Sequence, residues 1–107
     1  MVFGSNGAGA HAGGAARFAL DNFGAVWGQS EGLQGRSYAI DTMSGLDVMS
    51  EQIGRFLSFA ETHPELMFLV TEIGCGIAGY TPADVAPLFT RRPVNVQLPD
   101  AFTGVAA

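Results

Sequence analysis

Apolar residues recur along the chain with two different spacings, and these spacings predict alternating strands and helices. Short apolar runs typical of strands occupy residues 2–5, 37–40, 67–74 and 94–99. Apolar residues return every three or four positions over residues 13–23 and 46–63, as on one face of a helix. The order of these elements predicts one domain over residues 1–107, an α/β fold with a small, mostly parallel sheet of about four strands between helices.

Polar residues, glycine and proline indicate where the two longer helices begin and end. Gly24 follows the first helix in the place of a left-handed C-cap residue. Ser44 and Asp47 have the spacing of a capping box before the second helix, which we expect to end before Pro64. The central strand at 67–74 is apolar at successive positions, which predicts helices on both of its faces.

The remaining segments are short. Residues 27–36, rich in glycine and polar side chains, are predicted to form a loop. Thr81, Pro82 and Asp84 mark a helix start, with a cap, a proline at the first helical position and an acid in the first turn. We expect the strand at 94–99 to lie at an edge of the sheet and the tail from residue 100 to be partly disordered.

The charge of the chain excludes several classes of function. The formal net charge is −5 and all five basic residues are arginine. A protein that binds duplex DNA needs a cationic surface, so we expect no nucleic-acid partner. Because the chain contains no lysine, a Schiff base or a lysine phosphate clamp is also excluded.

The sequence shows no transmembrane run of about 18 apolar residues and no secretory signal. We therefore expect a cytoplasmic protein, in the host cytoplasm if it is viral, without a membrane partner. A single cysteine excludes an internal disulfide and a multi-cysteine zinc site. We expect no metal and no cofactor.

Two glycine-rich segments, GSNGAGAHAGG and IGCGIAGY, each lead from a predicted strand into a helix. In parallel sheets, ligands bind beyond the carboxyl ends of the strands, so both segments are expected to line one pocket. Glycines let backbone amides approach an anion, although neither segment matches a known phosphate fingerprint. The sequence predicts a phosphorylated ligand that is bound through amides.

GSNGAGAHAGGAA, FGAVWGQSEGLQGRSYAI, FLVTEIGCGIAGY and APLFTRRPVNVQLPDAF resemble a family of short bacterial and phage proteins of macrodomain-like fold, over nearly the whole chain. The resemblance implies that the pocket binds ADP-ribose or a related nucleotide. It places Asn6 at the distal ribose, Gly13 and Gly14 against that ribose, and Tyr80 where the phosphate loop closes. The full set of candidate ligand-binding residues is Ser5, Asn6, His11, Gly13, Gly14, Thr42, Gly74, Cys75, Gly76, Ile77, Gly79 and Tyr80.

The chain differs from that short family at four positions near the expected pocket. Ala10 stands where a basic residue is usual and Ala12 where glycine is usual. Asp41 replaces a proline, and Glu72 replaces an arginine. The lysine of the hydrolases that release glutamate-linked ADP-ribose has no equivalent here, so that mechanism does not transfer.

Each candidate side chain also has a structural interpretation. Asn6 binds ligand or caps its own loop. His11 acts as a general base, orients a ribose hydroxyl or is a solvated loop residue. Asp41, with Thr42, holds a ligand group or forms a turn. Cys75 lies in an amide nest that would stabilise a thiolate, or is a small buried residue.

Glu72 and three aromatic residues also have both a ligand-binding and a structural interpretation. Glu72 faces the pocket, a helix or a subunit partner. The aromatic rings that could stack on adenine or pack in the core are Trp27, Phe89 and Phe102.

Three functions follow from these observations. The first is binding of ADP-ribose or a related nucleotide, linear or cyclic, which in a viral protein would sequester an immune signal. The second is an ADP-ribosyl hydrolase in which His11 or Asp41 activates water. The third is an assembly protein with a vestigial pocket. Because a small sheet with exposed edges has apolar surface to cover, we expect a homo-oligomer, a dimer or larger.

Overall fold

Strands and helices alternate through residues 1–104, the part of the chain that the computed structural model describes. The elements are β1 (Val2–Ser5), α1 (Gly14–Asn22), β2 (Gly32–Gln34), β3 (Ser37–Asp41), α2 (Leu46–Glu61), β4 (Phe68–Leu69), α3 (Pro82–Val85), η1 (Ala86–Phe89), β5 (Val96–Gln97) and α4 (Asp100–Thr103). The predicted α/β class is confirmed.

The strands are paired in both senses. β1 runs parallel to β3, with Val2 opposite Tyr38, and β2 lies antiparallel on the other side of β3. β4 and β5 form a parallel pair, which a parallel bridge between Val2 and Val70 joins to β1. The pairing is therefore mixed, where the sequence analysis predicts a mostly parallel sheet.

β2 accounts for this difference, because residues 27–36 were predicted to be a loop. A two-residue turn, Gly35–Arg36, connects β2 to β3 and sets Gln34 opposite Ser37. Gly35 has a φ of +61°, a conformation that two-residue hairpin turns favour. A Cβ at this position would lie 2.6 Å from the carbonyl oxygen of Gly24, so the turn requires glycine.

The larger core lies between the strands and α2. Met49, Ile53, Phe56 and Ala60 form the buried face of α2, as their spacing predicts, and they pack against residues that include Ile40. The helix ends at Glu61, ahead of Pro64, also as predicted.

The capping box predicted at the start of α2 is wrong. Gly45 is the N-cap residue and no side chain caps this helix. The hydroxyl of Ser44 donates instead to the carboxylate of Asp41, which lies beneath it at the end of β3.

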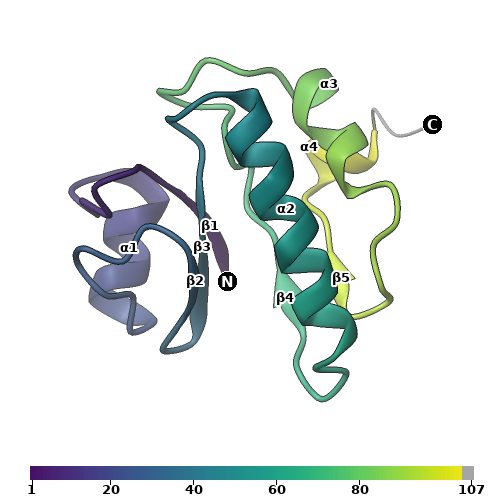
Figure 1. Cartoon of the computed structure of the whole chain (residues 1–107), viewed down its shortest axis with the longest axis horizontal. Helices are drawn as coiled ribbons and strands as arrows, with labels where there is room; N and C mark the ends of the chain where they lie inside the picture. The colour runs from purple at the N-terminus through teal and green to yellow at the C-terminus, as the bar shows by residue number, and fades with distance from the viewer. Residues whose placement is uncertain (105–107) are drawn as a thin grey trace.

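α1 covers the opposite face of the strands (Figure 1). Its smaller core consists of Phe3, Ala16, Ala19, Ala25 and Ala39. This helix does not extend over β4, where the side chain of Leu69 is 52% exposed. The prediction that residues 67–74 are covered on both faces is therefore wrong, because the helix layer ends before it reaches them.

The C-terminal part confirms two predictions and corrects one. Thr81 and Asp84 form a reciprocal capping box at the start of α3, and β5 lies at the end of the strand order. Residues 100–103, predicted to be partly disordered, form α4, because Phe102 is fully buried and stacks on Phe89. Residues 105–107 of the same predicted tail lie outside the described part of the chain.

Candidate functional site

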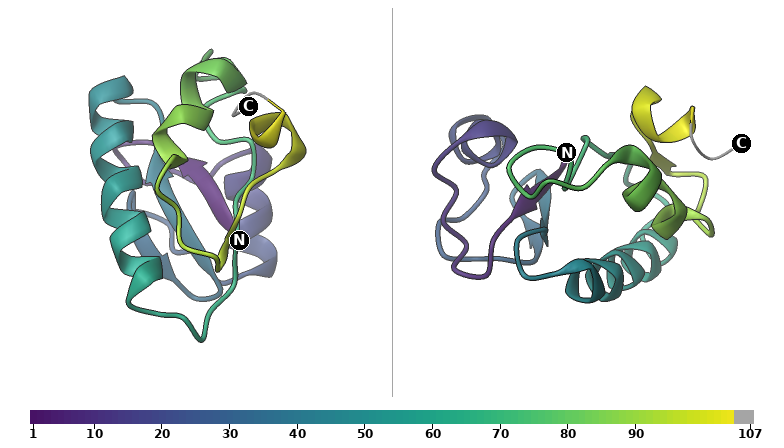
Figure 2. Two further views of the ribbon diagram at one scale, coloured as in Figure 1. Left: turned by 90° about the vertical axis from the view of Figure 1, so that its right-hand side faces the viewer. Right: turned by 90° about the horizontal axis from the view of Figure 1, so that it is seen from above.

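The loops that follow β1, β3 and β4 meet at one end of the molecule, near the N-terminal end of α1 (Figures 1 and 2). A cleft of about 280 Å³ lies between them. It is lined by Gly4, Gly13, Gly14, Ala15, Ala16, Thr42, Thr71, Glu72, Ile73, Gly74, Gly76, Ile77 and Ala78. Six of the candidate ligand-binding residues are in this set: Gly13, Gly14, Thr42, Gly74, Gly76 and Ile77.

One wall of the cleft is the first turn of α1. Its N-cap residue is Gly13, which has no side chain to accept a hydrogen bond, and the first turn contains no acidic residue. The first backbone bond of the helix runs from the amide of Arg17 to the carbonyl of Gly13. Residues 14–16 therefore have amides without an acceptor in the described chain, at the positive end of the helix dipole.

The other wall is the loop over residues 71–78, which internal hydrogen bonds hold in shape. The amide of Tyr80 donates to the carbonyl of Gly74 at 2.9 Å. The amide of Gly79 donates to the carbonyl of Gly76 at 3.0 Å. Within residues 1–104, the amides of Gly76, Ile77 and Ala78 have no acceptor. Tyr80 and Gly79 thus close the loop without lining the cleft.

Gly74 fixes the base of this loop. Its φ is +76°, and a Cβ here would lie 3.3 Å from the sulfur of Met49 and 3.3 Å from the ring of Tyr80. A side chain at this position would strain the backbone and press on the α2 core.

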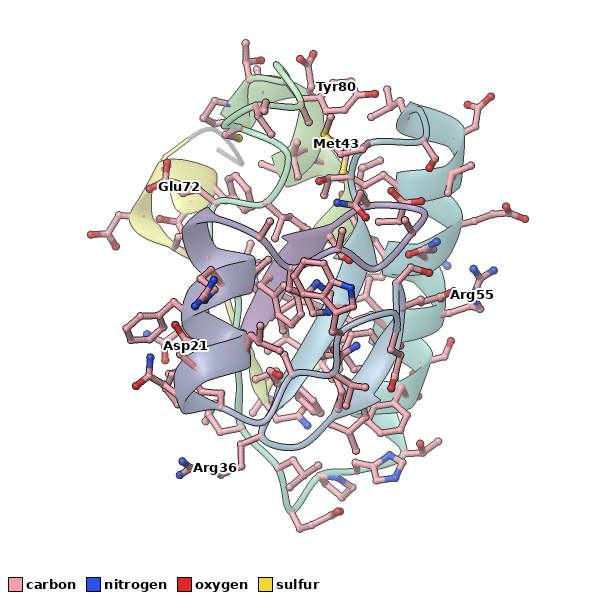
Figure 3. The ribbon with its side chains drawn as sticks, turned by 90° about the vertical axis from the view of Figure 1, so that its left-hand side faces the viewer. Asp21, Arg36, Met43, Arg55, Glu72 and Tyr80 are labelled. Carbon is pink, nitrogen blue, oxygen red and sulfur yellow. The ribbon has the colours of Figure 1, made fainter. Side chains whose placement is uncertain are left out.

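The charge in the cleft comes from Glu72, the one titratable side chain in its lining. Figure 3 shows Glu72 beside the first turn of α1. Thr42 and Thr71 also line the cleft, but their hydroxyls donate to backbone carbonyls of Ser5 and Val2. The donors available to a ligand are therefore backbone amides, and the acceptor beside them is a carboxylate.

Cys75 is in the same loop, and the pKa of its thiol is shifted in the direction opposite to the one expected from an amide nest. Burial raises the pKa of the thiol, and the negative charges of Glu72 and Asp84 raise it further. The loop therefore favours the neutral thiol, and the expectation of a stabilised thiolate is wrong.

Asn6 does not line the cleft, and its side chain is bonded to its own loop. Its Nδ2 donates to the carbonyl of Ala10 at 3.1 Å, and its Oδ1 accepts the amide of Ala10 at 2.9 Å. Of the two interpretations of Asn6, the structure therefore shows the one in which the side chain caps its own loop. Ser5, almost fully buried, does not line the cleft either.

His11 is a core residue. The ring is fully buried, meets Phe3 edge-on and places Nε2 3.1 Å from Oε1 of Gln34. It does not line the cleft, so neither the general-base nor the solvated-loop interpretation describes it. The cause is β2, the strand that the sequence analysis missed, because β2 carries Gln34.

Asp41 forms a turn. Its carboxylate is buried, accepts the amide of Met43 at 2.9 Å and accepts the hydroxyl of Ser44. The aromatic candidates also lie elsewhere: Phe89 and Phe102 are fully buried, and Trp27 does not line the cleft.

The sequence analysis missed six lining residues: Gly4, Ala15, Ala16, Thr71, Ile73 and Ala78. The signal for Ala15 and Ala16 is the glycine at the N-cap, which leaves the first helical amides without a side-chain acceptor.

Searches of protein-family models, curated proteins and solved structures found no match to this chain. Residues 1–104 contain no group of three or more histidine, cysteine or acidic side chains that could hold a metal ion. Among the helices described, none has the length and apolar character needed to span a bilayer.

Proposed function

We propose that the cleft binds a phosphorylated nucleotide of the ADP-ribose type, linear or cyclic, with its phosphates between α1 and the loop over residues 71–78. One observation carries the proposal: two sets of unpaired backbone amides, at residues 14–16 and 76–78, line the same cleft. Most of these residues are exposed, so a ligand can reach their amides, and a helix N-terminus with free amides favours an anion.

The size of the cleft supports a ligand of which only part is enclosed. A volume of about 280 Å³ is just below the range of small-molecule pockets, which span roughly 300–1,000 Å³. We infer that the phosphates and the adjoining sugar are enclosed, whereas the base lies across the rim. Ile77, 95% exposed, offers an apolar surface at that rim.

The arrangement of a strand, a glycine loop and a helix beside a second glycine loop is consistent with a macrodomain-like fold, which remains part of the proposal. The geometry favours binding over hydrolysis. His11 and Asp41, the two candidate bases, are buried and hydrogen-bonded away from the cleft. Glu72 has no hydrogen-bonded partner among the described residues that would position it as a base.

Calorimetric titration and thermal unfolding with ADP-ribose, its cyclic isomers, AMP and pyrophosphate test the proposal. A ligand at ~100 times its Kd adds roughly 2.7 kcal/mol to the free energy of unfolding. We expect ADP-ribose compounds to stabilise the protein, with AMP weaker because it lacks the second phosphate. A protein that none of these ligands stabilises would overturn the proposal.

Gly76→Glu is the matching variant. Gly76 does not have a positive φ, and a Cβ there meets open space, so the substitution fills the cleft without backbone strain. We expect it to abolish binding while the fold is retained. Gly54→Glu is the control, since Gly54 is exposed on α2 with the same open surroundings and lies outside the cleft.

A further inference from the structure

Glu72 is the group in the cleft that the proposed phosphate contacts do not use. Its side chain is exposed and lines the cleft beside the first turn of α1 (Figure 3). Within residues 1–104, its carboxylate accepts no hydrogen bond and joins no ion pair. The carboxylate is therefore available to a ligand that occupies the cleft.

No basic side chain among the described residues lines the cleft to offset this charge. Two of the five arginines are paired elsewhere, Arg17 with Asp21 and Arg55 with Glu31. Exposed carboxylates are ionised at neutral pH, so the side chains that line the cleft carry one negative charge. The attraction for an anion comes from the backbone amides and from the helix dipole, which is equivalent to about half an elementary charge.

This balance of charge discriminates between two kinds of phosphate. A terminal phosphate carries about 1.5–2 negative charges at pH 7, whereas a phosphate esterified on both sides carries a single charge. The additional charge of a terminal phosphate is repelled by the carboxylate. A sugar hydroxyl in the same place donates a hydrogen bond to the carboxylate, and such bonds to charged groups are stronger than bonds between neutral groups.

We propose that Glu72 determines the specificity of the cleft by accepting a hydrogen bond from a hydroxyl of the sugar that follows the phosphates. The favoured ligand is a diphosphate that is esterified at both ends, with a hydroxylated sugar beside the second phosphate. A nucleotide that ends in a bare phosphate is disfavoured. The inference rests on the proposed function, because it requires that phosphates occupy the two sets of amides.

Calorimetric titration with three ligands separates the two effects of the carboxylate. ADP-ribose has the second ester and the sugar, the β-methyl ester of ADP has the ester without the sugar, and ADP ends in a phosphate. We expect the wild-type protein to bind ADP-ribose about five times more tightly than the methyl ester, and the methyl ester about three times more tightly than ADP. EDTA is added so that no divalent cation bridges the phosphates and the carboxylate.

Two substitutions of Glu72 test its role in both preferences. Glu72→Ala removes the charge and the acceptor, so the preferences for the sugar and for the ester are both expected to fall. Glu72→Gln removes the charge but keeps an acceptor oxygen, so it is expected to abolish the preference for the methyl ester over ADP and to retain part of the preference for the sugar. Glu51→Ala, which removes an exposed acid of α2 outside the cleft, is the control and is expected to keep both preferences.

The possible results separate the role of Glu72 from the phosphate site on which it depends. If all three ligands bind with preferences that Glu72→Ala leaves unchanged, the role of Glu72 is overturned and the phosphate site stands. Binding of ADP-ribose that requires Mg²⁺ would also overturn this role, because the carboxylate would then hold a cation. A protein that binds none of the three ligands would overturn the proposed function together with this inference.

Discussion

His11 and Gln34 form a buried hydrogen bond between the loop after β1 and strand β2, with Nε2 and Oε1 3.1 Å apart. The oxygen of Gln34 also accepts the amide of Val26 at 2.7 Å, while its Nε2 donates to the carbonyl of Gln29. Oε1 of Gln34 is therefore an acceptor, so Nε2 of His11 donates the hydrogen bond. The other ring nitrogen, Nδ1, is buried without a partner in the described chain.

This arrangement predicts that His11→Ala lowers stability without affecting ligand binding. The substitution removes a fully buried ring and leaves Gln34 with one fewer donor, a loss of about 2–4 kcal/mol in the free energy of unfolding. Urea unfolding measures the loss, and titration of the folded fraction with ADP-ribose measures the affinity.

His63→Ala is the matched control for His11→Ala. The ring of His63 is half-buried, stacks on Phe59 at 4.0 Å and hydrogen-bonds to its carbonyl. We expect a smaller loss, about 1 kcal/mol. A stable His11→Ala protein with impaired ligand turnover would instead identify His11 as a base.

The sequence predicts most of the elements because their signals are local. The face of α2 repeats every three or four residues, and the capping box of Thr81 and Asp84 spans a single turn. β2 has only three residues, one of them glycine, too few for a period to appear. The sequence signal for its hairpin is the glycine at position 35, because two-residue hairpin turns favour glycine.

For the candidate site, the sequence predicts the position of the loops but not which side chains enter the cleft. Topology places the two glycine loops at one end of the strands, and this much the sequence predicts. Which side chains enter the cleft depends on contacts between distant residues. His11 turns inward because Gln34, 23 positions along the chain, accepts a hydrogen bond from its ring, and Asn6 is held by a hydrogen bond within its own loop.

The uncapped start of α1 predicts a trade between stability and binding. Gly13 has extended backbone angles, φ −157° and ψ 172°, which suit an N-cap aspartate, and a Cβ there meets open space. In Gly13→Asp, the carboxylate would accept the free amides of the first turn. We expect stability to rise by about 0.3–1 kcal/mol and anion binding to be lost, as measured by thermal unfolding with and without pyrophosphate.

Gly54→Asp provides the comparison for charge, since it adds the same side chain on the outer face of α2. Binding should persist in that variant. If Gly13→Asp retained full affinity for pyrophosphate, the amides of α1 would not be part of the anion site.

Glu72 is expected to weaken the binding of simple anions, because its carboxylate lines the cleft between the two sets of amides. Glu72→Gln should raise the affinity for pyrophosphate about two- to fivefold, a change of under about 1 kcal/mol because the charge of Glu72 is exposed to solvent. Calorimetric titration measures it. Glu51→Gln, which removes an exposed acid from α2, should leave the affinity unchanged.

The same substitution has a second readout at Cys75. The pKa of this thiol is raised first by burial and then by the negative charge of Glu72, so Glu72→Gln should lower the pKa and speed alkylation at a fixed pH. The folded thiol titrates above its ordinary value of 9.0, so its contribution to stability is present below that pH and is lost as the pH rises through the folded pKa. An unchanged alkylation rate in the variant would contradict the placement of Glu72 beside this loop.

The turn at Gly35 gives the last prediction, because it carries the hairpin that buries His11. A Cβ here would lie 2.6 Å from the carbonyl oxygen and 2.7 Å from the Cα of Gly24, which are backbone atoms that cannot rotate away. Gly35→Ala adds the cost of a positive φ to that clash, and we expect a loss of about 2–4 kcal/mol in urea unfolding. Gly54→Ala, in open space within α2, should instead gain about 0.5–1 kcal/mol, because alanine loses less backbone entropy in a helix. Equal effects of the two substitutions would mean that the turn does not bring Gly35 against Gly24.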